Sequence, residues 1–262
     1  DSRVYAIEKR GMEAADRVAL KDGLALSIET TEDGQRYAQA RLGDVLDAPE
    51  LFAAYPELRD VTVTFIQGEG TEYQGERTPS GTTYAEDNSI EIEGDFAADG
   101  TTLNPGDNGK TRSVLLHEIQ HAVQNIEGFA PGTSVEQAML NSPEIQEYEE
   151  KIKALKGQIR ELEEKQRREF SLEDDERLNE LNAEREKLEN ARDTVYERGF
   201  SNGRAFDLYD RNSGEVQARN VSARMDMTAE ERRAKLLEET EDVSREDQIV
   251  LRDALGMSES RA

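Results

Sequence analysis

Residues 113–126 constrain the fold more than any other stretch of the chain. They read SVLLHEIQHAVQNI, and Glu118 is the only charged residue among them, although 35% of the whole chain is Asp, Glu, Lys or Arg. Their apolar residues recur with helical spacing, which predicts a mostly buried α-helix whose back faces a core. Thr111 is the predicted N-cap and Gly128 the predicted stop. Because a buried carboxylate is costly without a partner, Glu118 is expected to have a chemical role.

Both histidines of the chain lie in this predicted helix, four residues apart. Positions i and i+4 stack on one helix face, so the imidazoles of His117 and His121 can hold one metal ion. Glu118 lies one turn before His121, where its carboxylate can take a proton from a water at the metal's open position. The alternative is that two neutral histidines fill core positions and are four apart by coincidence. We favour the metal site because a glutamate directly after the first of two such histidines is a specific motif.

A third ligand is expected, because zinc sites that act on water typically have three protein ligands and one position for solvent. The chain has no cysteine and no further histidine, so an Asp, a Glu or a Tyr must supply it. Glu215 is the candidate, in the first turn of a predicted helix that begins near Gly214 and has the small Ala218 one turn later. Its alternative role is to stabilise that helix N-terminus electrostatically. Three acids nearer in sequence remain rivals: Glu127, Glu136 and Glu144.

The HExxH motif that starts at His117, followed by GEVQA at residues 214–218, resembles the gluzincins, the zincin metallopeptidases whose third zinc ligand is glutamate. The sequences of residues 42–47 and 115–124, together with this motif, also resemble the metallopeptidase-like domains of large phage and prophage polyvalent proteins. The resemblance implies a zincin-like fold and the hydrolysis of peptide bonds, with Glu118 as general base. It also implies that three residues hold Zn2+: His117, His121 and Glu215.

Two further expectations come from the resemblance. Gluzincins often stabilise the oxyanion with a Tyr or a His besides the zinc, and no histidine is left for this role. Tyr209 is therefore a predicted catalytic residue and Tyr84 its alternative, although either could be an ordinary core or surface tyrosine. An edge strand is also expected to align the substrate backbone above the metal. Residues 89–93, with acids on one face and isoleucines on the other, are predicted to be that edge strand.

The rest of the chain predicts a small mixed sheet that packs on the metal helix. Residues 60–65 alternate with period two, which predicts a strand, and residues 82–93 read as a β-hairpin. Residues 29–58 are predicted to carry two or three short helices, one of which has Pro49 near its first turn. The helix that carries Glu215 is expected to cross beneath the metal helix. The predicted fold class is α+β.

A change of composition predicts an appendage to this core. Residues 144–197 are dense in Glu, Lys and Arg, with sparse apolar residues at coiled-coil a/d spacings on two arms. Ser171 can cap the second arm, so an inserted antiparallel helical hairpin is expected. The core would then consist of residues 1–143, which include the metal helix, and residues 198–262, which end in a polar tail.

The formal net charge of −25 limits the partners of the chain. Such a surface repels bare phosphate backbones, so no nucleic-acid partner is expected; an acidic DNA mimic is a weaker hypothesis. No apolar run approaches a membrane span and no secretory segment opens the chain, so no membrane partner is expected either. These features fit the bacterial cytoplasm or a virion. The chain starts at Asp1 rather than Met, which is compatible with a segment of a longer protein.

The leading hypothesis is a phage or prophage zinc metallopeptidase that acts on a peptide or protein substrate. The alternative is a non-catalytic module in which zinc staples two helices and the helical hairpin docks a protein partner.

Overall fold

The computed structural model describes these residues: 19–20, 26–67, 71–73, 76–78, 81–84, 87–94, 110–128, 132–169 and 171–250. The fold is α+β, as predicted, and the chain forms two compact units. The first consists of Asp1–Gly132 and Ser213–Gln248, and the second of Thr133–Asn212 and Ile249–Ala262. Among the described residues, no helix is both long enough and apolar enough to span a lipid bilayer.

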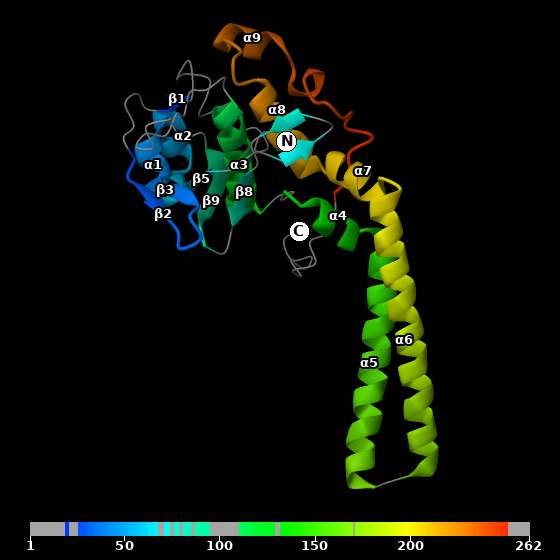
Figure 1. The fold of residues 1–262 in the computed structure, drawn as a ribbon. Helices are drawn as coiled ribbons and strands as arrows, with labels where there is room; N and C mark the ends of the chain where they lie inside the picture. The colour runs from blue at the N-terminus through cyan, green and yellow to red at the C-terminus, as the bar shows by residue number, and fades with distance from the viewer. Residues whose placement is uncertain are drawn as a thin grey trace. The chain divides into compact units, whose positions relative to one another are not determined.

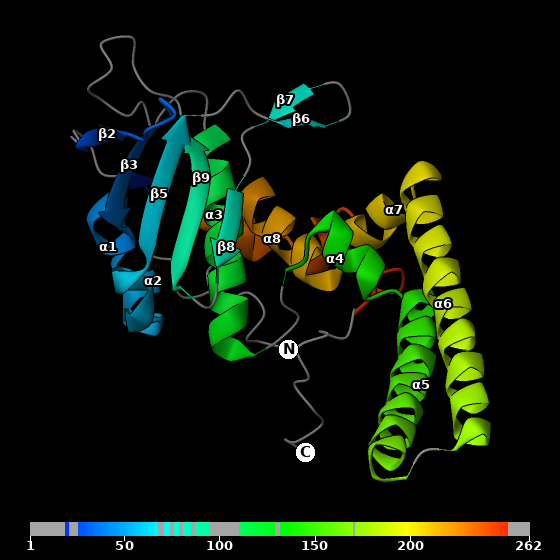
Figure 2. The ribbon, with the colours of Figure 1, turned by 60° about the horizontal axis from the view of Figure 1, so that its bottom comes forward.

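Among the described residues, five strands form the mixed sheet of the first unit (Figure 2). Their order is β2 (Ile28–Thr30), β3 (Arg36–Arg41), β5 (Thr62–Gln67), β9 (Ser89–Gly94) and β8 (Gly81–Tyr84). Strands β5 and β9 are parallel and the other pairs are antiparallel. Alternation turns four buried side chains to the core: Val63, Phe65, Ile90 and Ile92.

Residues 89–93 form a strand as predicted, but the prediction that this strand lies at the edge of the sheet was wrong. Strand β9 lies inside the sheet, between β5 and β8, and β8 is the strand at the edge among those that the structure describes. The acidic residues of β9, Glu91 and Glu93, alternate with buried isoleucines because one face of the sheet faces solvent and the other faces the core. Such alternation reports a strand with one exposed face and says nothing about which strand ends the sheet.

The helices predicted in residues 29–58 are found only in the second half of that stretch. There the chain forms α1 (Leu42–Val45), α2 (Pro49–Ala54) and a 3-10 turn at Pro56–Asp60. Residues 36–41 form β3 instead, because pairing between β2 and β5 buries Ala38 and overrides the helical propensity of the segment. Two short pairs complete the strands of the unit: β1 (Ala19–Leu20) with β4 (Leu46–Asp47), and β6 (Thr71–Tyr73) with β7 (Glu76–Thr78).

Helix α3 (Lys110–Glu127) is the predicted metal helix, and it packs on β8 and β9. Its apolar back, with Leu115 and Ile119 fully buried, joins the main core. The helix begins at Lys110, so Thr111 lies inside it and is not its cap. Gly128 follows the last residue and has a φ of 64°, so it ends the helix as predicted.

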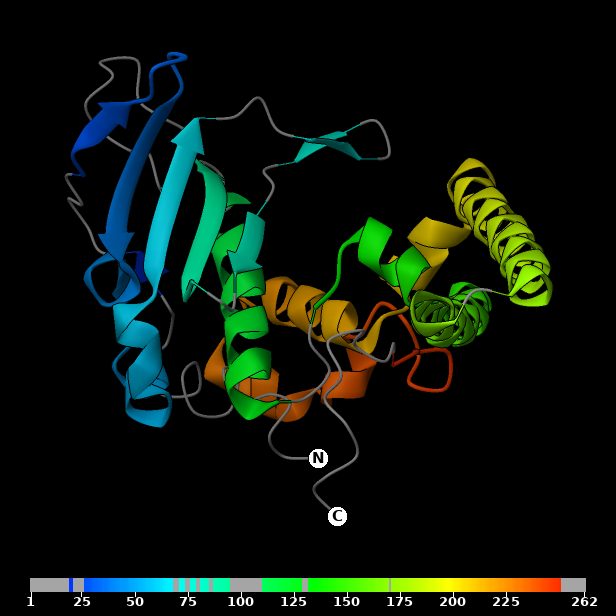
Figure 3. The ribbon, with the colours of Figure 1, turned by 90° about the horizontal axis from the view of Figure 1, so that it is seen from below.

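Helix α8 (Ser213–Ala223) lies against α3, which separates it from the sheet (Figure 3). Near the start of α3, one hydrogen bond joins it to α8 and another joins it to Met225, two residues beyond the end of α8. Ser222 Oγ donates to the carbonyl of Ser113 over 2.8 Å, and Arg112 Nη2 donates to the carbonyl of Met225 over 3.1 Å.

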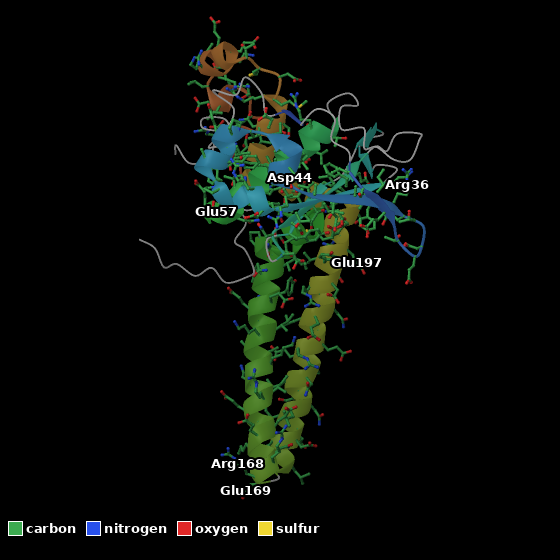
Figure 4. All side chains as sticks on the ribbon, turned by 90° about the vertical axis from the view of Figure 1, so that its left-hand side faces the viewer. Arg36, Asp44, Glu57, Arg168, Glu169 and Glu197 are labelled. Carbon is green, nitrogen blue, oxygen red and sulfur yellow. The ribbon has the colours of Figure 1, made fainter. Side chains whose placement is uncertain are left out.

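The second unit is built around the predicted hairpin. Helices α5 (Pro143–Arg168) and α6 (Leu172–Ser201) run side by side over their length (Figure 1). Their seam buries four apolar side chains: Leu155, Ile159, Leu178 and Leu181. Arg168 and Glu169 lie at the turn between the helices, where Ser171 Oγ accepts a hydrogen bond from the Asp174 amide (Figure 4).

The predicted insertion, residues 144–197, falls inside this second unit. The unit also includes α4 (Val135–Leu140) before the hairpin and α7 (Arg204–Asp210) after it. These two helices form a second apolar cluster that includes Met139 and Leu208. The chain therefore leaves the first unit after Gly132 and returns to it at Ser213, directly before Glu215.

Arg224 anchors the segment that follows α8. This segment contains α9 (Ala229–Ala234) and a 3-10 turn at Leu237–Glu239. Arg224 is 2% exposed, and its terminal nitrogens donate to four oxygens: the carbonyls of Arg232, Lys235 and Leu236 and the hydroxyl of Thr240. The buried charge is thus solvated by the chain itself.

We expect Arg224→Met to lower the free energy of unfolding by about 3 kcal/mol, because it leaves several buried acceptors without a donor. Urea unfolding followed by circular dichroism measures this change. Arg233→Met is the matched control, since Arg233 is exposed in the same segment. An equal effect of the two substitutions would contradict the anchoring role of Arg224.

Candidate metal centre

Helices α3 and α8 bring the three predicted ligands together. One nitrogen of His117, one nitrogen of His121 and one carboxylate oxygen of Glu215 lie within 4.8 Å of one another. The two imidazoles meet edge to face, with centroids 4.7 Å apart and planes at 84°. Each carboxylate oxygen faces a different ring: Oε2 is 3.3 Å from Nε2 of His117, and Oε1 is 3.4 Å from Nε2 of His121.

These two separations fit a cation better than a shared proton. A charge-assisted hydrogen bond between nitrogen and a carboxylate is about 2.7–2.9 Å long. By contrast, two ligands that each lie about 2.0–2.1 Å from a tetrahedral zinc ion are about 3.3–3.4 Å apart. Two imidazole nitrogens and one carboxylate oxygen are also a donor set that zinc accepts. The residues present therefore fit a zinc ion.

The electrostatics of the site favour positive charge between these groups. Burial lowers the pKa of His121, but the carboxylate of Glu215 outweighs burial and raises this pKa to about 9. Burial in turn raises the pKa of Glu215, which is 1% exposed, but the two imidazoles hold it well below its usual range. The carboxylate is thus ionised in a place where a charge without a cation nearby would be very costly.

The three rival acids are not part of this group of ligand atoms. Glu127, at the end of α3, accepts a hydrogen bond from the Tyr55 hydroxyl over 2.7 Å. Glu144 pairs with Arg204 over 2.6 Å in the second unit, and Glu136 is exposed in the first turn of α4.

Gln124 links the two helices at the site, a role that sequence analysis missed. Its Nε2 donates to the carbonyl of Gly214 and to Oε1 of Gln217, both over 3.0 Å. The Gly214 carbonyl can only accept, so the amide orientation is determined and Oε1 faces Nδ1 of His121 over 2.9 Å. His121 then carries a proton on Nδ1, and its Nε2 faces Glu215. The signal in the sequence was a polar side chain one helical turn after His121.

Glu118, the predicted general base, is 4% exposed and contacts the edge strand β8. The Thr83 hydroxyl lies 2.8 Å from Oε2 of Glu118 and 2.9 Å from its carbonyl oxygen, and it donates to them. Nothing in the sequence alone indicated that Thr83 would be the partner, because the contact depends on which strand ends the sheet.

Two glycines make room for the site. A Cβ at position 81 would lie 2.7 Å from both Cγ and Oε1 of Glu118, so β8 can pass this carboxylate only with glycine there. A Cβ at position 132 would overlap the imidazole of His121. Gly81 and Gly132 therefore allow the backbone to approach closely, because a Cβ at either position would clash with the side chain of Glu118 or His121.

The two predicted oxyanion residues have different surroundings. Tyr209 belongs to α7 in the second unit, where it packs against the apolar cluster around Met139. Tyr84 ends β8 in the first unit, and it is 44% exposed. The catalytic role of Tyr209, and that of Tyr84 as its alternative, stays a prediction.

No protein-family model matches the chain, and no curated protein or solved structure matches it either.

We expect Gln124→Met to weaken zinc binding by about 10- to 100-fold, because it frees the His121 ring and removes one link between α3 and α8. Competition with a chromophoric chelator measures the affinity. Gln124→Glu is the matched control: it keeps an acceptor for His121 Nδ1 and should lose less affinity. Zinc binding by Gln124→Met at the original affinity would rule out this role.

Proposed function

We propose that the chain is a zinc-dependent metallopeptidase of the gluzincin type. The observation that carries the proposal is the pair of separations, 3.3 and 3.4 Å, between Glu215 and the two imidazoles, with the buried carboxylate of Glu118 on the same helix. His117, His121 and Glu215 would hold Zn2+. The chemistry that bound zinc supplies in such a site is Lewis acidity, which makes water more acidic and polarises a carbonyl group.

The chain's own contribution to hydrolysis centres on Glu118. In the proposed reaction its carboxylate accepts the proton of the attacking water and later gives a proton to the leaving amine. The hydrogen bond from Thr83 would hold the carboxylate in place and leave Oε1 for this work. The backbone at Gly81 passes close to the Glu118 carboxylate and would shield this carboxylate from bulk water.

Strand β8 is the proposed support for the substrate backbone. As the edge strand of the described part of the sheet, it offers backbone groups to which an extended peptide can add by β-pairing. Gly81 and Thr83 face Glu118, so a peptide paired with β8 would pass beside the general base. This replaces β9 as the proposed docking strand.

The zincin-like fold is part of the proposal. Three features support this fold: a mixed sheet with an antiparallel edge strand, a helix with two histidines that packs on the sheet, and a second helix with a glutamate. The resemblance to polyvalent proteins supports a phage or prophage origin, with a bacterial cytoplasmic or virion location. The net charge of −25 supports a peptide or protein partner rather than a nucleic acid.

A specific observation also favours the docking alternative. The hairpin makes up most of the second compact unit, and charged side chains project from it along its length (Figure 4). A partner could bind this surface while zinc only joined α3 to α8.

The first test of the peptidase is Glu118→Gln. We expect this variant to keep its zinc and to lose about 10²- to 10⁴-fold in kcat on an unstructured peptide, because an amide cannot accept the proton. Peptide cleavage followed by mass spectrometry and metal analysis of the same sample measure both quantities. His121→Ala is the control and should lose the metal. Cleavage by Glu118→Gln at the wild-type rate would refute the mechanism.

The second test separates the two functions by shortening the hairpin. Arg192 and Glu149 form an ion pair of 2.6 Å across the helices, so a short glycine linker can replace residues 150–196. We expect the shortened protein to cut an unstructured peptide at a rate within about threefold of the full chain, because the metal ligands and Glu118 all lie in the first unit. The docking module would be favoured if neither the full chain nor the shortened protein cut the peptide, and if a protein partner bound the full chain but not the shortened protein.

A further inference from the structure

Helix α8 is too short to fix its own position. It has eleven residues, and isolated helices shorter than about 12–15 residues are marginal in water. Eight of the eleven residues are buried, so the helix depends on contacts over most of its surface. Helix α3 supplies some of them: Gln124 binds the Gly214 carbonyl, and Ser222 binds the carbonyl of Ser113. The position of Glu215 therefore also depends on what else holds α8.

Residues 225–248, which we call the strap, bind α8 as well. The strap contains α9 and the 3-10 turn at Leu237–Glu239, and it belongs to the first unit. Arg224, directly after α8, holds four oxygens of the strap. Asn220 lies on the same helix face as Arg224, one turn earlier, and is 2% exposed. Its Nδ2 donates to the carbonyl of Leu237 over 3.2 Å, so the strap is tied to the helix at a second point.

The tie nearest to the metal ligand in sequence is the ion pair of Arg219 with Asp242. Arg219 Nε and Nη2 donate to the two carboxylate oxygens of Asp242, over 2.5 and 3.3 Å. A bidentate pair of this kind fixes orientation as well as distance. Arg219 follows Glu215 by about one helical turn. Asp242 of the strap thus holds α8 next to the turn that carries the ligand.

The strap runs from one end of α8 back to the other. It starts directly after Arg224, beyond the last turn of the helix. Ile249, the residue that follows the strap, donates from its amide to the Arg211 carbonyl over 2.8 Å and forms a parallel β-bridge with Asn212. Asn212 directly precedes the first residue of α8. The strap and α8 are therefore joined at both ends as well as by the ties between them.

Polar ties limit the movement of a helix more than apolar contacts do. A hydrogen bond needs a narrow range of distance and angle, whereas the hydrophobic effect has no direction. Side chains that form a functional site must be held within about 0.5 Å of their productive positions. Directional contacts from α3 and from the strap meet this requirement for Glu215.

We propose that the strap sets the position of the metal ligand Glu215, and that Arg219, through its ion pair with Asp242, is a positioning residue of the metal centre. The inference rests on the metal site of the proposed function. Arg219 acts through Asp242 and the helix rather than on the metal itself.

The test measures the zinc affinity of the full-length protein by competition with a chromophoric chelator. We expect Arg219→Met to bind zinc about three- to tenfold more weakly, because loss of this partly exposed pair loosens α8 but removes no ligand. Asp242→Asn should have a similar effect. Arg41→Met is the matched control and should keep the original affinity. Arg41 forms an ion pair of 2.9 Å with Asp60 in the same unit, between β3 and the 3-10 turn at Pro56–Asp60.

Two further measurements separate positioning from a general loss of stability. The variant that combines Arg219→Met with Asp242→Asn should bind zinc no more weakly than the weaker of the single variants, because the two residues act as one pair. The absorption spectrum of bound cobalt(II) should change in both single variants but not in Arg41→Met, because it depends on the geometry of the ligands. A role in stability alone would lower the free energy of unfolding and leave the zinc affinity of the folded protein and the cobalt spectrum unchanged.

The original zinc affinity in both single variants, additive losses in the combined variant, or an equal loss in Arg41→Met would overturn the inference. If Arg219→Met does not fold, Asp242→Asn decides alone, because Asp242 lies outside α8 and is half exposed. Peptide cleavage tests the proposed function separately. If Asp242→Asn binds zinc more weakly and the wild type cuts no peptide, the strap stands and the peptidase falls. If the wild type cuts peptides and Asp242→Asn binds zinc as tightly, the peptidase stands and the strap falls.

Discussion

The buried carboxylate of Glu215 is the constraint on which the first unit depends. It is 1% exposed and ionised, so it needs positive charge beside it, and the imidazoles of His117 and His121 are the groups that can hold a cation there. This requirement couples α3 to α8. The coupling is built at both ends of their contact: Gln124 holds the start of α8, and Ser222 holds the start of α3. Packing and charge therefore specify the same helix pair.

The large gap in sequence between His121 and Glu215 follows from the two-unit organisation. The chain leaves the first unit after Gly132, builds α4 to α7 in the second, and re-enters at Ser213. Both ends of this excursion lie at the candidate metal centre: Gly132 lies against the His121 ring, and Glu215 is two residues beyond the return. An insertion at these points lengthens the chain without separating the ligands, because α3 and α8 are held by contacts within the first unit.

The sequence could predict what depends on local pattern and on short motifs. The HExxH helix follows from its spacing and the hairpin from its a/d repeats. The place of Glu215 beside the histidines follows from its position in the first turn of a helix with the pattern Glu-x-x-Ala and from the resemblance to the gluzincins. The sequence could not predict which strand lies at the edge of the sheet. An alternation of polar and apolar residues indicates one solvent-exposed face in β9 and in β8 alike. Gln124 and Thr83 were missed for a related reason: their partners become neighbours only when distant segments pack. Strand β3 shows the same limit, since pairing on both sides decided its conformation.

The exchange of β9 for β8 at the edge changes the chemistry expected of the substrate. An edge formed by β9 would have placed Glu91 and Glu93 beside a peptide paired with it, where they would repel acidic side chains. Strand β8, the edge strand among the described residues, reads GTTY and carries no charge. Residues 113–126 hold a single charged residue, Glu118, in a chain of net charge −25. In the proposed site, the charges beside a bound peptide would thus come from Glu118 and the metal ligands rather than from the strand that pairs with the peptide.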